Sequence, residues 1–185
     1  MTVPHQPIVR GVPTWDWQHP PRSVSRADVD AESDERVSQM VYFALIPRVA
    51  GTVDEQYATT KSWTKGLQML WATQLVDDEV NNGGFNQYFF NRSGQWAMEA
   101  IEGFRLIGVI ERAEIVKAAV DQFFADAPTL RRYYQEHTLE SFSESYKHTQ
   151  LDRLDKRWYA APNFHLARTE YIRRHPDEFT LPPPR

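Results

Sequence analysis

The strongest constraint on the fold is the stretch from Ser62 to Val80, which has apolar side chains at helical spacing on two opposite faces. A helix with one apolar stripe is covered from one side, whereas a helix with two stripes must be covered from both. The two stripes consist of Trp63, Leu67, Leu70 and Trp71, and of Met69, Ala72, Val76 and Val80. We therefore predict that this segment is the central helix of a globular domain.

Further helical patterns flank this segment. A first helix is expected to begin at a Ser33 N-cap and to end at Pro47 and Gly51. Residues 95–108 and 110–124 show two more helical patterns, and the short link between them favours an antiparallel helical hairpin.

Three helices are expected towards the C-terminus. They lie over 126–137, with Pro128 in the first turn, over 151–159, and over 163–175, with Asn163 as the cap. No stretch alternates apolar and polar residues for long enough to predict a strand. The fold class is therefore all-α.

The chain is expected to divide at residue 30. Residues 31–185 are predicted to form a single multi-helix globular domain, and residues 1–30 an irregular Pro-rich arm with five of the twelve prolines. The arm also contains Trp15 and Trp17, and two interpretations of them stay open. The indoles either dock on the surface of the domain or form a linear motif that binds another protein.

Four turn-forming residues follow the central helix: Asn81, Asn82, Gly83 and Gly84. Because Asn and Gly tolerate positive φ, they predict a helix end and a tight reversal. Substitution of Gly83 by Val is accordingly expected to destabilise the fold by more than about 1 kcal/mol. A short helix is predicted to begin near Gly84, since aromatic residues then recur at helical spacing: Phe85, Tyr88 and Phe89.

Three carboxylates, Asp77, Asp78 and Glu79, precede this turn, at the helix end where negative charge is unfavourable. A short reversal brings the free N–H groups of the next helix close. We therefore expect Glu79 or Asp78 to accept hydrogen bonds from them, which would offset a mismatch of roughly 0.3–1 kcal/mol. Polar side chains after the turn are expected to be local hydrogen-bond partners: Asn86, Gln87 and Asn91.

Composition excludes several classes of function. The chain of 185 residues has no Cys, which excludes disulfides, thiolate zinc sites and a Cys nucleophile. No apolar run approaches the ~20 residues of a membrane span, and no signal peptide is apparent, so we expect a cytoplasmic protein without a membrane partner. The net charge of −4 argues against direct binding of nucleic acid, which needs a clustered basic surface.

No catalytic motif is apparent, although one metal-based alternative stays open. The six histidines lack the spacing of a zinc helix, and no nucleophile elbow, phosphate loop or dinucleotide fingerprint is present. We therefore expect no cofactor and favour a protein without enzymatic activity. The alternative is a metal-dependent hydrolase in which Asp77, Asp78 and Glu79 bind a hard cation.

One long string is more specific than these patterns. The sequence "EVNNGGFNQYFFN" at 79–91, with its flanking helical patterns, resembles the helical domain family named after the DNA mimic proteins of bacteria. The similarity extends over about residues 35–180. It implies an all-α fold and, for the characterised member, an acidic homodimer whose carboxylates imitate DNA phosphates and occupy the DNA-binding surface of a transcription factor. The motif residues are expected to be structural: Glu79, Asn81, Asn82, Gly83, Gly84, Phe85, Gln87, Tyr88, Phe89 and Asn91.

The middle of the chain is acidic. Residues 54–126 contain eleven acids and six bases, a net charge of −5. This charge and the resemblance support one leading hypothesis. The protein is expected to be a non-catalytic interaction protein, a homodimer that binds a basic or DNA-binding protein. The candidate partner-binding carboxylates are Asp77, Asp78, Glu99, Glu102, Glu111, Glu114 and Asp121.

Overall fold

Helices form nearly all of the regular structure in the computed structural model, which describes residues 15 and 18–183. Within these residues no strand forms, and one antiparallel bridge joins Val24 to Leu181. The predicted all-α fold with a single multi-helix domain is confirmed. The described α-helices are α1 Arg26–Ala31, α2 Val37–Leu45, α3 Val53–Lys61, α4 Lys65–Phe90, α5 Ala97–Leu106, α6 Ile110–Glu136, α7 Leu139–Ser145, α8 Asp152–Ala160 and α9 His165–Arg174; the short 3-10 helices are η1 Ile46–Arg48, η2 Ser93–Trp96, η3 Tyr146–His148 and η4 Pro176–Phe179.

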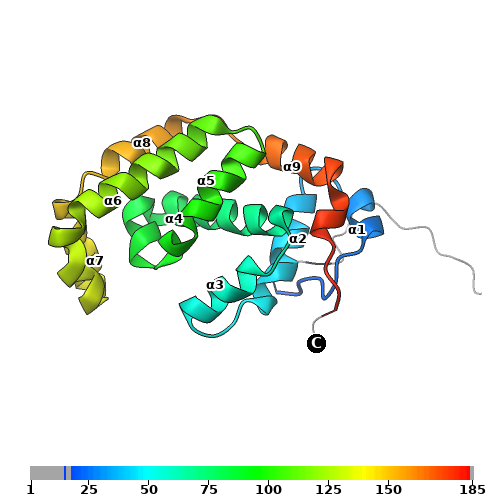
Figure 1. Cartoon of the computed structure of the whole chain (residues 1–185), viewed down its shortest axis with the longest axis horizontal. Helices are drawn as coiled ribbons and strands as arrows, with labels where there is room; N and C mark the ends of the chain where they lie inside the picture. Colours follow the sequence, from blue (N-terminus) through cyan, green and yellow to red (C-terminus); the bar gives the residue numbers. More distant parts are fainter. Residues whose placement is uncertain (1–14, 16–17, 184–185) are drawn as a thin grey trace, which may run out of the picture.

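Helix α4 lies at the centre of the molecule, as its two apolar faces predict. In Figure 1, α5 and α6 cover one side of it, while α1, α2 and α9 gather around one end. Both predicted stripes are buried within α4: Leu67, Met69, Leu70, Trp71, Ala72, Val76 and Val80. The helix begins at Lys65 rather than at Ser62, because the Thr64 hydroxyl accepts the Leu67 N–H and caps it. None of the described helices has the length and apolar character needed to span a membrane.

The predicted hairpin is formed by α5 and α6, which pack against each other after the short link at 107–109 (Figure 1). The expectation of a separate helix over 126–137 is wrong, because α6 continues through Pro128 to Glu136. Asp126 does not cap a new helix. Its carboxylate accepts hydrogen bonds from the Gln122 side chain and the Thr149 hydroxyl, so it fixes the segment before α8 instead.

Two helix starts differ from the predictions. The N-cap of α9 is Phe164 rather than Asn163, although the Asn163 side-chain oxygen, one residue earlier, accepts the His165 N–H at 2.7 Å. The expected Ser33 cap is wrong. Helix α2 begins at Val37, and the Ser33 carbonyl, not its hydroxyl, accepts the N–H groups of Arg36 and Val37.

The described part of the arm is in contact with the helices. Trp15 is buried, its indole N–H donates to Glu32 at 2.9 Å, and its ring meets the ring of Phe43 edge-on. These contacts favour the docking interpretation for Trp15, whereas Trp17 lies outside the described residues. The division at residue 30 stays a prediction, which limited proteolysis would test, and α1 extends across it.

Candidate functional site

The turn-forming residues produce a kink within α4 rather than a reversal. The prediction that Gly83 has positive φ is wrong: Gly83 has φ −156° and ψ 32°, and the residue with positive φ is Gly84, at +69°. A Cβ on Gly84 would overlap with a carboxylate oxygen of Asp155 on α8. Asp155 is this close because it accepts the Phe85 N–H at 2.7 Å. The free N–H at the new helix start is thus satisfied from α8, not by Glu79 or Asp78 as expected.

Glu79 has a structural role through side chains instead. Its carboxylate accepts hydrogen bonds from Gln87 at 2.7 Å, Asn91 at 2.9 Å and the Ser93 hydroxyl at 2.8 Å. The Asn82 amide donates to Gln87 at 3.0 Å and extends the network. A carboxylate at this helix end is therefore stabilised by donors that come from beyond the kink.

The aromatic residues of the motif are part of the core. Phe85 packs edge-on against Trp158 of α8, and Phe89 stacks on Phe123 of α6 with ring centroids 4.4 Å apart. Tyr88 is fully buried beside Phe85. Asn86, expected to bond locally, is also fully buried; its amide donates to Ser145 and accepts from Tyr134.

The three carboxylates before the kink point to different partners. Asp78 accepts hydrogen bonds from Gln74 at 2.8 Å and from Tyr42 at 3.3 Å, and burial raises its pKa. Asp77 accepts from Asn81 at 2.9 Å and lies 3.8 Å from His165. Because Asp77, Asp78 and Glu79 diverge, they do not form the cation site of the hydrolase alternative. No group of three or more metal-ligating side chains occurs in the described part of the chain.

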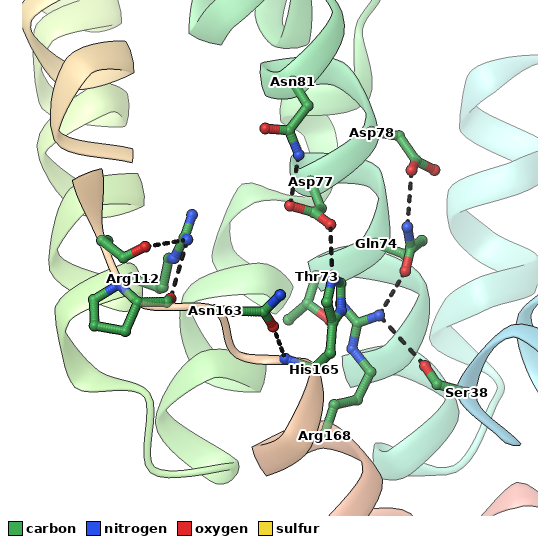
Figure 2. Close-up of polar contacts among 12 residues, drawn as sticks. Ser38, Thr73, Gln74, Asp77, Asp78, Asn81, Arg112, Asn163, His165 and Arg168 are labelled. Carbon is green, nitrogen blue, oxygen red and sulfur yellow. Dashed lines mark hydrogen bonds and ion pairs between the residues drawn. The ribbon is translucent and has the colours of Figure 1, made fainter. Parts of the chain in front are cut away.

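Two arginines that were not among the candidate residues lie beside Asp77. Arg168 of α9 and Arg112 of α6 are almost fully buried, with exposed fractions of 1% and 6%. Their guanidinium groups lie over the ring of Phe164, at 4.8 Å and 5.2 Å from its centroid. Arg112 also lies 4.0 Å from the ring centroid of Trp158. Figure 2 shows Asp77 between the two arginines, on the side of α4 that faces α9.

Neither arginine has a carboxylate within ion-pair distance among the described residues. Burial lowers the pKa of Arg168 to about 10, while Asp77 and Asp78 act in the opposite direction. Burial likewise lowers the pKa of Arg112 against the effect of Asp77. For His165, burial and then Arg168 lower the pKa. Asp77 is therefore the one carboxylate whose charge acts on both arginines.

Two cavities meet at Asp77 and His165. The larger, with a volume of about 650 Å³, lies between α2, α4 and α9; we call it the acidic groove, and its charged lining residues are Asp34, Glu35, Asp77, Asp78, His165 and Arg168. The smaller, of about 290 Å³, is called the Arg112 cavity, and its polar lining residues are Asp77, Asn81, Arg112, Tyr159, Asn163 and His165.

The candidate carboxylates of α5 and α6 are less available than the sequence suggests. Glu99 is buried and accepts from Lys61 at 2.8 Å and Tyr57 at 2.7 Å, so it forms an internal ion pair. Glu114 and Asp121 are exposed but pair with Arg105 and Lys117. Among the described residues, Glu102 and Glu111 are exposed and have no ion-pair partner.

Comparison with known proteins identifies one family. The model of a family described as "DMP19-like protein" matches residues 61–175, which is more than half of the chain and includes the kink, both arginines and both cavities' shared residues. No curated protein matches the chain, and no solved structure matches it. The chain belongs to the family of DMP19-like proteins.

Proposed function

We propose that this protein is a non-catalytic interaction protein that binds a basic, DNA-binding protein through its acidic groove. DMP19-like proteins are a DNA-mimic family, and family membership fits an interaction role of that type. A cytoplasmic location is part of the proposal. The observation that favours the groove over other acidic surfaces is that four carboxylates line one cavity: Asp34, Glu35, Asp77 and Asp78.

In the groove, Glu35 and Asp78 have no basic side chain within ion-pair distance among the described residues. A partner's Lys or Arg side chain would favour the charged form of Asp78 and so offset the desolvation that raises its pKa. Leu166, which is 67% exposed, and Phe43 add apolar surface next to the acids. A basic side chain with a long alkyl stem fits such a lining.

The acids of α5 and α6 contribute less in this proposal. Glu102 and Glu111 extend the negative surface, whereas Lys117 and Arg105 neutralise Asp121 and Glu114 locally. Glu99 is left out of the partner surface, since its charge is compensated inside the protein by Lys61. Duplex DNA presents one phosphate charge per ~1.7 Å of axis, so the acids of one chain imitate a short segment at most.

The test is capture of a partner that DNA displaces. The protein is immobilised, incubated with bacterial lysate at low salt, and eluted with duplex DNA; proteins in the eluate are identified and their affinities measured after purification. We expect the eluate to contain a basic DNA-binding protein. Its capture should be lost at high salt, because the attraction is electrostatic. If no eluted protein binds DNA, the proposed function is wrong.

A matched pair of variants tests the groove itself. Charge reversal at Glu35 and Asp78, both to Lys, is expected to weaken binding of the purified partner by at least about tenfold, which is roughly 1.4 kcal/mol. The control reverses Glu140 and Asp152, two exposed acids on α7 and α8 outside the groove, with the same change in net charge. Equal losses in both variants would show that only net charge matters.

We further propose that the protein is a homodimer that associates through the exposed apolar surface of α5 and α6. Phe124 is 68% exposed and Met98 59% exposed, and both line a cavity of about 400 Å³ with Phe123. Such side chains are typical of interfaces. Measurement of the molar mass by light scattering should give a dimer for the wild type and a monomer for Phe124→Asp. A monomeric wild type would contradict the proposed dimer but would not affect the proposal that the acidic groove binds a partner.

A further inference from the structure

A further cavity lies far from the acidic groove. It is found between the end of α4 and the C-terminal half of α6, at the opposite end of the molecule from α2 and α9 (Figure 1). Its volume of about 600 Å³ is typical of cavities that hold small organic ligands. We call it the aromatic cavity, and its apolar walls are Phe90, Phe123, Ala127, Leu130 and Tyr134.

Contacts behind these walls hold them in place. Phe123 stacks on Phe89 with ring centroids 4.4 Å apart, and Leu130 is fully buried. The Tyr134 hydroxyl donates at 3.0 Å to Asn86, which is itself fully buried. A ligand therefore enters a site whose apolar surface is already ordered, and the entropic cost of binding is low.

The charged side chains at the aromatic cavity are basic. Arg92, Arg131 and His137 line it, and among the described residues no carboxylate does. Arg131 has no ion-pair partner in the described part of the chain, and Arg92 has a weak one: it lies 3.8 Å from Asp54, with the two side chains 62% and 83% exposed. In a chain with a net charge of −4, this lining favours an anionic ligand.

The backbone gives a second, independent observation. Among the described residues other than glycine, Arg92 and His137 have positive φ, at +62° and +50°, and both line the aromatic cavity. Each lies at a helix end, where Gly is usual because a Cβ makes this conformation unfavourable. His137 stacks on Phe90, which accounts for its ring, whereas Arg92 has the exposed pair with Asp54 alone. Such strain is typical of functional positions.

We propose that the aromatic cavity binds a small carboxylate with an aliphatic or aromatic body, such as a medium-chain fatty acid or an arylalkanoate. The apolar body packs between Phe90 and Phe123, where its burial provides most of the affinity. The carboxylate lies at the rim against Arg92 and Arg131, since a guanidinium matches its two oxygens. This site shares no residue with the acidic groove and does not rest on the proposed protein partner.

The experiment is isothermal titration of the full chain with octanoate, 4-phenylbutyrate and indole-3-acetate. The amide of each probe has the same apolar body without the charge, and sodium acetate has the charge without the body. We expect at least one probe to bind at least about tenfold more tightly than its amide and than acetate, because the body and the charge both contribute.

One variant separates binding from strain. Arg92→Gly removes the guanidinium and relieves the backbone at positive φ. Binding of the probe should therefore fall by at least about tenfold, while the melting temperature stays the same or rises. An arginine that serves the fold alone would give the opposite pair of results: a lower melting temperature and unchanged binding.

Two further variants assign the binding to the cavity. Arg131→Gln should weaken the carboxylate probe but not its amide, and its matched control, Arg157→Gln, removes an exposed arginine of α8 outside the cavity and should bind as the wild type does. Ala127→Phe keeps both arginines and fills the space between the walls, so it should weaken the probe and its amide alike.

Four results would overturn the proposal: no binding of any probe, equal affinities for each probe and its amide, wild-type binding by both Arg92→Gly and Arg131→Gln, or wild-type binding by Ala127→Phe. If the wild type binds no probe and the Phe124→Asp variant does, a second copy of the chain covers the cavity instead. Circular dichroism verifies that each variant is folded; if Ala127→Phe is not, the arginine variants decide. None of these results depends on a protein partner, so the proposed function is tested separately.

Discussion

Glu79 and Asp77, two residues apart on α4, lie in polar surroundings of opposite kinds. Glu79 accepts three side-chain hydrogen bonds, from Gln87, Asn91 and Ser93, and its environment is complete. Asp77 accepts one hydrogen bond and faces two buried arginines that retain free donors. The first arrangement is typical of architecture, since every group in it has its partners within the chain.

In the second arrangement, buried donors of both arginines have no acceptor among the described residues. Each hydrogen bond of a complete network contributes to stability, whereas each buried donor without an acceptor costs free energy. The difference separates the family string, whose residues build the kink, from the neighbouring residues that we assign to binding. The following predictions test that separation.

The largest effect is expected at the kink that both regions depend on. Gly84→Ala should lower the free energy of unfolding by about 3 kcal/mol, because it combines strain at positive φ with displacement of Asp155 from the Phe85 N–H. Denaturant unfolding measures the change.

Gly83→Ala is the matched comparison for this prediction. Gly83 has no positive φ, and its added Cβ meets first the end of the Gln87 side chain, which can move, so a loss of about 1 kcal/mol is expected. A larger loss at Gly83 than at Gly84 would contradict the assignment of the kink.

Removal of the acceptor in the complete network should have the next largest effect. Glu79→Gln retains the shape of the side chain but removes its charge and replaces one acceptor oxygen by an NH2 group that faces at least one of the three donors, and we expect a loss of about 2 kcal/mol in unfolding free energy. Asp78→Asn, one residue away, should change stability by less than about 0.5 kcal/mol, because its hydrogen bonds with Gln74 and Tyr42 are exposed to water and partial desolvation disfavours its charged form. Equal losses for the two variants would show that the hydrogen bonds of Glu79 contribute no more to stability than those of Asp78.

Sequence reasoning could find the Glu79 network because its parts are close along the chain. Gln87, Asn91 and Ser93 follow Glu79 within fourteen residues, so the helix and kink bring them together without help from distant segments. The central position of α4 was likewise evident, since two apolar faces allow few alternatives. The choice between Gly83 and Gly84 could not be predicted, because it depends on Asp155, which is 70 residues from its hydrogen-bond partner Phe85.

The arginine cluster gave a weaker signal that was present nonetheless. Arg112 precedes Ile115 and Val116 by three and four residues, and therefore lies on the buried face of α6; Arg168 has the same relation to Tyr171 and Ile172 in α9. A cation at an apolar-face position predicts a buried charge. That two such charges converge on Asp77 from separate helices depends on tertiary packing, which local spacing does not encode.

Removal of a cation from the incomplete cluster should affect stability less than removal of Glu79. Arg168→Met keeps an apolar stem of similar length, eliminates a fully buried charge, and frees Gln74 and Ser38, which are only partly buried and can bind water. We expect a change in unfolding free energy within about 1 kcal/mol of the wild type, in either direction. A loss as large as that of Glu79→Gln would show that Arg168 has a structural role equal to that of the complete network.

The last effect, which changes with pH, concerns Glu99, a buried carboxylate with one basic partner that is intermediate between the two cases. Burial by itself would raise the pKa of Glu99, but hydrogen bonds from Lys61 and Tyr57 outweigh it and leave the pKa lowered. A carboxylate whose pKa falls on folding contributes stability above the pKa of the unfolded chain, and this contribution disappears as the pH falls through the lowered value. Glu99→Gln should therefore lower the free energy of unfolding by about 1 kcal/mol at pH 7 and by less at acid pH. The loss at pH 7 is small because Lys61 is 43% exposed and water weakens the ion pair. Urea unfolding across this pH range measures the difference. If the loss of stability in Glu99→Gln grows towards acid pH, burial rather than the ion pair dominates at Glu99. The surroundings of Glu99 would then resemble those of Asp77 more than those of Glu79.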